Sequence, residues 1–253
     1  MYRFLAVFVS VFAVLLFASP VFAAKNDEAL SILSHLYVTN GQLPVNDIVI
    51  EYEEMSSDAD APMQLSSKDK LYFKKPVKIR VDSIMVDPGS VNDGKNLIII
   101  RDGVNAWLYL SSGQYPVKKQ LDEQASPFCL PFGLTHYPKD LEKEYMVEGK
   151  ESVDGVGAVK VSITDSTAQQ FVWIDTSRWV PLKFQSTTKD GNKETTKMTL
   201  YKNIGQTKDG RYFPMRLERY VDGRLTNLIV YKGLVVNAGL SDDLFSPLNK
   251  LLQ

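Results

Sequence analysis

Charged and apolar residues alternate over residues 77–82, with Ile79 and Val81 among the apolar positions. This period of two predicts an antiparallel strand with one buried face and one face in solvent. Two later runs, 97–100 and 107–110, are apolar at both parities. A strand that is apolar on both faces needs a covering on each face. The second covering is either packed protein or a cavity that holds an apolar ligand.

Short strand-like runs recur along the rest of the chain, and turns with Asp-Gly or another glycine separate them at spacings of about 10 to 14 residues. These later runs are 142–151, 158–164, 170–175, 179–186, 195–201, 212–221 and 225–236. The pattern predicts a mainly β (α+β) protein, with about ten or eleven antiparallel strands in one meander. A large curved sheet, forming an incomplete, unclosed barrel, is the simplest architecture for it.

Two short helices and one irregular segment accompany the predicted sheet. Residues 26–38 carry apolar residues at helical spacing, and Ser241 can cap a last short helix. The segment 126–138 is apolar, but its prolines exclude a regular strand or a long helix. Long apolar loops of this kind are typically lids or binding loops. A loop that only seals the core remains an equal alternative.

The first 23 residues have the pattern of a cleaved secretory signal: Arg3, an apolar run to Ala18, and a small residue at Ala23. Residues 24–253 are then predicted to form a single exported, soluble domain. Without Arg3, 28 basic residues face 30 acidic ones. This balance favours neither nucleic acid nor an anionic membrane as a partner.

The sequence lacks the residues of common catalytic and metal sites. Cys129 is the only cysteine, and His35 and His136 are the only histidines. Cys129 lies among apolar residues and is interpreted as a small buried side chain, although a nucleophile is the alternative. No enzyme activity, cofactor or metal is therefore predicted. A hydrolase with two remote carboxylates would leave no local signature and remains open.

Several motifs resemble those of the LolA-type periplasmic lipoprotein carriers. The similarity extends over nearly the whole mature chain, and its specific part is the first block of motifs. That block is Leu71–Pro76, Lys78–Arg80, Ile100–Gly103 and Ala106–Tyr109; weaker matches are Phe171–Asp175 with Pro181 and Leu182, and Asp243–Pro247.

This resemblance implies an unclosed antiparallel barrel whose concave face is covered by helices and a loop. It implies a carrier that binds the acyl chains of lipoproteins, or another lipid, for sorting to the outer membrane. An inner-membrane lipoprotein-releasing transporter and an outer-membrane acceptor would be its partners. Relatives of this family also include sensors of lipoproteins or envelope stress, so a regulatory interaction module is the alternative.

The resemblance also suggests a lid latch. The carriers have an arginine before the proline that follows the second strand, and this chain has Lys75 there. Lysine keeps the charge but lacks the planar fork of donors, so the closing mechanism is expected to differ. The mature chain is also longer than a typical carrier, which leaves the identity of the cargo open.

The candidate site follows from the two-faced strands and the irregular segment. The predicted cavity wall is Ile79, Val81, Ile98, Ile100, Trp107, Tyr109, Phe171, Trp173, Phe184, Leu228 and Val230. The predicted lid residues are Phe128, Leu130, Phe132 and Leu134. For each wall residue, ordinary sheet core is the alternative, and the sequence does not decide which parity of a strand faces the cavity.

Overall fold

The computed structural model describes residues 27–36, 46–57, 62–75, 78–91, 93–102, 105–110, 117–118, 143–164, 168–191, 193–208 and 210–248. The predicted signal segment 1–23 and the predicted lid 126–138 lie outside these residues. No helix in the described ranges is long and apolar enough to cross a membrane.

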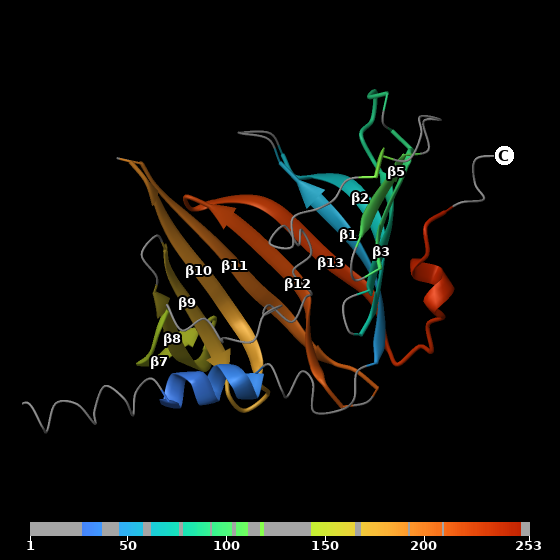
Figure 1. Cartoon of the computed structure of the whole chain (residues 1–253). Helices are drawn as coiled ribbons and strands as arrows, with labels where there is room; N and C mark the ends of the chain where they lie inside the picture. The colour runs from blue at the N-terminus through green and yellow to red at the C-terminus, as the bar shows by residue number, and fades with distance from the viewer. Residues whose placement is uncertain are drawn as a thin grey trace, which may run out of the picture. The chain divides into compact units, whose positions relative to one another are not determined.

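The described chain is mainly β. Its strands are β1 (Asp47–Ser56), β2 (Gln64–Lys74), β3 (Lys78–Met85), β4 (Asn96–Arg101), β5 (Ala106–Leu110), β6 (Val117–Lys118), β7 (Glu144–Val153), β8 (Val156–Thr164), β9 (Ala168–Asp175), β10 (Val180–Asp190), β11 (Lys193–Gln206), β12 (Tyr212–Val221) and β13 (Arg224–Val236). A helix covers residues 27–36, and a 3-10 helix, η1, covers Asp242–Phe245 (Figure 1).

The strands form an antiparallel sheet in the order β6-β5-β4-β3-β2-β1-β13-β12-β11-β10-β9-β8-β7. Almost every strand therefore pairs with its neighbour in sequence, which confirms the predicted meander. Within the described residues β6 and β7 end the order and do not pair, so the sheet is not closed.

The chain divides into two compact units. Unit 1 contains residues 1–39 and 136–196, and unit 2 contains residues 40–135 and 197–253. The predicted single domain over 24–253 stays a prediction. Each unit has its own buried residues and is described separately.

In unit 1, the helix and strands β7–β10 share a core. Ala29, Leu33 and Leu36 are buried at the i, i+4, i+7 spacing of one helix face. The ring of His35 lies 3.7 Å from that of Trp179, between centroids. Trp179 was predicted to begin a strand, but it lies in the turn before β10, with a φ of 54°. This turn places its ring against the helix.

In unit 2, one face of the sheet carries a cluster of buried apolar residues. We call it the cluster face. Its buried members are Ile48, Ile50, Leu71, Ile79, Val81, Phe213, Leu217, Ile229 and Tyr231. Register pairing explains the arrangement, because Ile50 faces Leu71 on β2 and Leu71 faces Val81 on β3. Opposed residues point to the same side of a sheet.

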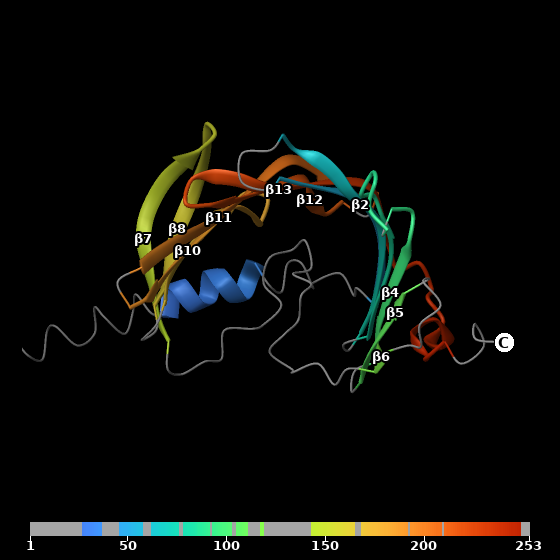
Figure 2. The same cartoon turned by 90° about the horizontal axis from the view of Figure 1, so that it is seen from above.

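The C-terminal segment, residues 237–248, lies on the other side of these strands, which we call the opposite face. Figure 2 shows η1 beside β4 and β5. Ser241 caps η1 by accepting a hydrogen bond from the backbone N–H of Asp243, as the sequence predicted. Phe245 of η1 is buried. This segment therefore covers part of the sheet without joining it as a strand.

Candidate functional site

The cluster face is an apolar surface that the strands of unit 2 assemble. Seven further apolar side chains pack against its buried members while keeping part of their surface exposed: Tyr52, Phe73, Ile99, Tyr201, Met215, Leu234 and Val236. Phe213 and Tyr231 meet edge to face, with ring centroids 5.0 Å apart. The face combines a fixed apolar floor with side chains that remain accessible to a ligand.

The opposite face of the same strands is polar over β13, β1 and β2. The ammonium of Lys70 lies 2.8 Å from the carboxylate of Glu51, and that of Lys232 lies 2.9 Å from that of Glu53. These pairs border a pocket of about 490 Å³, which also contains Ile98. Exposed ion pairs of this kind are ordinary surface chemistry. The two faces of unit 2 therefore differ strongly in polarity.

The strand registers divide the predicted cavity wall of unit 2 between the two faces. Ile79 and Val81 belong to the cluster face. Ile100 pairs with Arg80, the residue between them, and therefore lies on the opposite face. Five further wall residues lie on the opposite face, because each pairs with a residue of that face. The pairs are Ile98 with Asp82, Trp107 with Ile100, Tyr109 with Ile98, Leu228 with Glu218, and Val230 with Arg216.

The C-terminal segment supplies a covering for part of that second apolar face. Ile100 is fully buried. The backbone N–H of Leu248 donates to the hydroxyl of Tyr109 at 3.0 Å, and the guanidinium of Arg80 donates to the carbonyl of Leu244 at 3.3 Å. One of the two apolar faces of β4 and β5 thus meets the C-terminal segment, which lies far along the chain.

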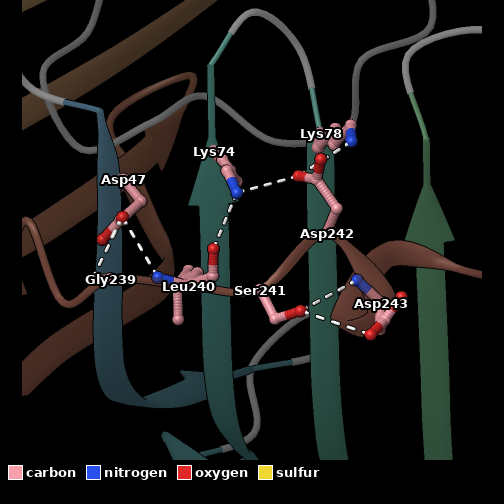
Figure 3. A network of polar contacts seen from close by, with 8 residues as sticks. All are labelled: Asp47, Lys74, Lys78, Gly239, Leu240, Ser241, Asp242 and Asp243. Carbon is pink, nitrogen blue, oxygen red and sulfur yellow. Dashed lines mark hydrogen bonds and ion pairs between the residues drawn. The ribbon is translucent and has the colours of Figure 1, made fainter.

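Figure 3 shows how the C-terminal segment is attached. The backbone N–H groups of Gly239 and Leu240 both donate to one oxygen of Asp47, at 3.2 Å each. The ammonium groups of Lys74 and Lys78 lie 2.8 and 3.0 Å from the carboxylate of Asp242. These two lysines lower the pKa of Asp242, so it is ionised at neutral pH.

In unit 1 the predicted wall residues are also divided. Phe184 pairs with Val172, whereas Trp173 pairs with Lys160 and Lys183, so Phe184 and Trp173 point to different faces. Phe171 shares the face of Trp173, with ring centroids 5.9 Å apart.

Trp173 has charged neighbours in addition to Phe171. The ammonium groups of Lys160 and Lys183 lie 5.0 and 4.2 Å from its ring centroid. Its indole N–H donates to the carboxylate of Glu151 at 2.6 Å. This hydrogen bond and that from Lys160 lower the pKa of Glu151. Two lysines therefore line this side of Phe171 and Trp173.

Sequence reasoning missed most members of the cluster face. Ile48, Ile50 and Leu71 alternate with polar or partly exposed residues, and this period of two is the signal that identifies them. Ile229 and Tyr231 lie in the run 228–231, where apolar residues occupy both parities. No local signal separates the two faces there.

Lys75 lies among the described residues, whereas the predicted lid does not. Lys75 is exposed, and its backbone N–H donates to the carbonyl of Asn46 at 2.9 Å. Phe128, Leu130, Phe132 and Leu134 lie outside the described residues, as do Cys129 and His136. Within the described ranges, no group of three or more His, Cys, Asp or Glu side chains is placed to hold a metal ion.

The fold is similar to that of three solved structures. A DUF1329 family protein from Desulfovibrio piger has a TM-score of 0.64 at 16% identity, covering 90% of this chain and 99% of that one. A putative outer membrane lipoprotein-sorting protein domain from Vibrio parahaemolyticus has a TM-score of 0.64 at 15% identity, covering 88% and 97%. A LolA superfamily protein from Nitrosomonas europaea has a TM-score of 0.55 at 14% identity, covering 88% and 98%.

These similarities define a class of fold. No protein-family model matches the sequence, and no curated protein matches it. The structural matches nevertheless extend over almost the full length of each relative. The chain therefore has the LolA-like fold, as its motifs suggested.

Proposed function

We propose that this protein is an exported, periplasmic carrier that binds the acyl chains of lipoproteins along the cluster face of unit 2. The observation that supports this most directly is the partly exposed apolar layer over a buried apolar floor. A similar domain from Vibrio parahaemolyticus is described as an outer membrane lipoprotein-sorting domain, which agrees with this cargo. Each methylene transferred from water to this face contributes about 0.8 kcal/mol, so a long acyl chain needs no charged contact.

The proposed wall is the cluster face and not the full predicted set. Ile79 and Val81 belong to the proposed wall. The other apolar residues of the cluster face take the place of the predicted wall residues that the register puts on the opposite face. The predicted lid, Phe128 to Leu134, remains a proposal for the cover. Lys75 remains a proposal for its latch. An inner-membrane releasing transporter and an outer-membrane acceptor are the partners expected of a carrier.

Two adjacent residues of β13 provide a matched test. Leu234 packs against the cluster and Val235 is exposed on the opposite face. We expect Leu234→Gln to weaken binding of a fluorescent acyl probe to the delipidated protein, and Val235→Gln to leave it unchanged. Native mass spectrometry of gently purified protein should show a bound lipid. A protein that neither carries lipid nor binds the probe would overturn the proposal.

A further inference from the structure

The cluster face changes from apolar to polar along its strands, at the same end on five of them. On β2 the polar Asp69 lies two residues before the apolar Leu71. On β3, which runs the other way, the polar Ser83 lies two residues after the apolar Val81. Residues two apart on a strand share a face. The polar end of the cluster face consists of Tyr52, Glu54, Ser67, Asp69, Ser83, Arg219 and Asn227.

Most groups of this polar end hydrogen-bond to one another. The side-chain amide of Asn227 donates to the carboxylate of Glu54 at 2.9 Å. The hydroxyl of Ser67 donates to the carboxylate of Asp69 at 2.5 Å, and Ser83 also hydrogen-bonds to it. Both carboxylates therefore accept hydrogen bonds, and the polar end is a built part of the sheet rather than a frayed edge.

Two donors of the polar end remain available. Among the described residues, the guanidinium of Arg219 has no hydrogen bond or ion pair, and the hydroxyl of Tyr52 has no hydrogen bond. Burial and the nearby carboxylates of Asp69 and Glu54 raise the pKa of Tyr52. Its hydroxyl is therefore protonated at any physiological pH and can donate. Arg219 is always charged and offers five N–H donors.

These donors adjoin the apolar floor, so they suit an oxygen acceptor attached directly to an acyl chain. The polar end carries one cation, Arg219, and two acids, Glu54 and Asp69. It therefore offers donors without a net positive charge. A neutral carbonyl oxygen fits this balance better than a phosphate or a carboxylate, which the two acids repel.

We propose that Arg219 and Tyr52 bind the ester carbonyl oxygens of a diacylglyceryl group whose acyl chains lie along the cluster face. This assignment rests on the proposed acyl-chain binding and adds the chemistry of the polar part of the cargo. The diacylglyceryl group of a lipoprotein and that of a free glyceride share this chemistry. Leu217 and Ile229 begin the apolar floor beside the two donors.

The test compares a diacylglycerol with its dialkyl ether, which has the same chains and no carbonyl oxygens. Competition against a fluorescent acyl probe would measure both affinities for the full mature chain. We expect the ester to bind about tenfold more tightly than the ether, because two ordinary hydrogen bonds are lost in the ether. Tyr52→Phe and Arg219→Gln should each weaken ester binding about three- to tenfold and leave ether binding unchanged.

Arg224→Gln is the matched control, because Arg224 is exposed at the first position of β13. Its ester and ether affinities should equal those of the unmodified protein. Equal binding of ester and ether by the unmodified protein would overturn the ester site and leave the apolar proposal standing. Absence of binding of either lipid would overturn the proposed function itself.

A further arm identifies the source of the diacylglyceryl group. A synthetic S-diacylglyceryl-cysteine peptide and a free diacylglycerol would compete for the same probe. Tighter binding of the peptide would assign the site to lipoproteins, and equal binding would assign it to glycerides in general. In both cases Tyr52→Phe must weaken binding for the assignment of Tyr52 to hold.

Discussion

The ammonium group of Lys74 lies 2.8 Å from the carboxylate of Asp242 and donates to the carbonyl of Leu240 at 2.7 Å. Lys74 and Asp242 lie far apart in the sequence, on the second strand and at the start of η1. Their contact holds the C-terminal segment on the opposite face, where Ile100 and Phe245 are both buried. A contact between β2 and the segment that contains η1 thus links this segment to one face of the sheet.

The C-terminal segment is expected to stabilise the fold mainly through Phe245. Phe245→Ala should lower the free energy of unfolding by about 3–5 kcal/mol, because its ring is almost fully buried and its removal leaves a cavity. Chemical denaturation measures the change. Ser246→Ala is the neighbouring control, with an exposed side chain, and should change stability by less than about 0.5 kcal/mol. Equal effects of the two substitutions would contradict the packing of η1.

The ion pairs of Asp242 should contribute far less than Phe245. The Asp242 side chain is largely exposed, so the solvent screens its attraction to Lys74 and Lys78. Lys78→Met should therefore have a small effect that diminishes as salt is added. A large effect that persists in high salt would show that the segment is held by charge.

The contribution of Asp175 to stability is expected to be lost in acid. Burial alone raises its pKa, but hydrogen bonds from Ser177 and Arg178 outweigh burial and lower it. A lowered folded-state pKa means that the contribution is present above the unfolded-state pKa and is lost as pH falls through the folded-state pKa. Asp175→Asn should therefore destabilise the protein at pH 7, by about 1–3 kcal/mol, with the deficit shrinking in acid. Denaturation curves at several pH values test this.

For Asp69 we expect the opposite effect of ionisation on stability. Burial raises its pKa, and hydrogen bonds from Ser67 and Ser83 only partly offset this. The folded state therefore binds this proton more tightly than the unfolded state, so ionisation of Asp69 costs stability at neutral pH. Asp69→Asn should raise stability at pH 7, and its advantage should vanish as pH falls below the unfolded-state pKa. A variant that is less stable at pH 7 would contradict this account.

The proposed latch predicts an effect on release and not on stability. Lys75 is exposed, so Lys75→Met should leave the melting temperature nearly unchanged. If Lys75 holds the cover closed, the substitution should increase the dissociation rate of an acyl probe, and Lys75→Arg should slow it. Lys68→Met, at another exposed lysine, is the control. Identical release rates for all variants would remove Lys75 from the mechanism.

Local signals in the sequence were sufficient to predict most of the strands and the turns between them. Asp154-Gly155 and Asp222-Gly223 were predicted as turns, and both pairs have positive φ values, which Asp and Gly adopt most readily. Ser241 was predicted as a cap for the same reason, since a cap depends on residues two or three positions away. The meander followed from the regular spacing of such turns.

The sequence alone determined a mainly β chain with an antiparallel, unclosed sheet, because alternation and turn chemistry are local. Only the tertiary structure decided which side of each apolar strand faces the cluster. Ile79 and Ile100 look equivalent in sequence, yet register places them on opposite faces. The reason is that η1, far along the chain, covers the second face, and no local pattern on β4 records this partner.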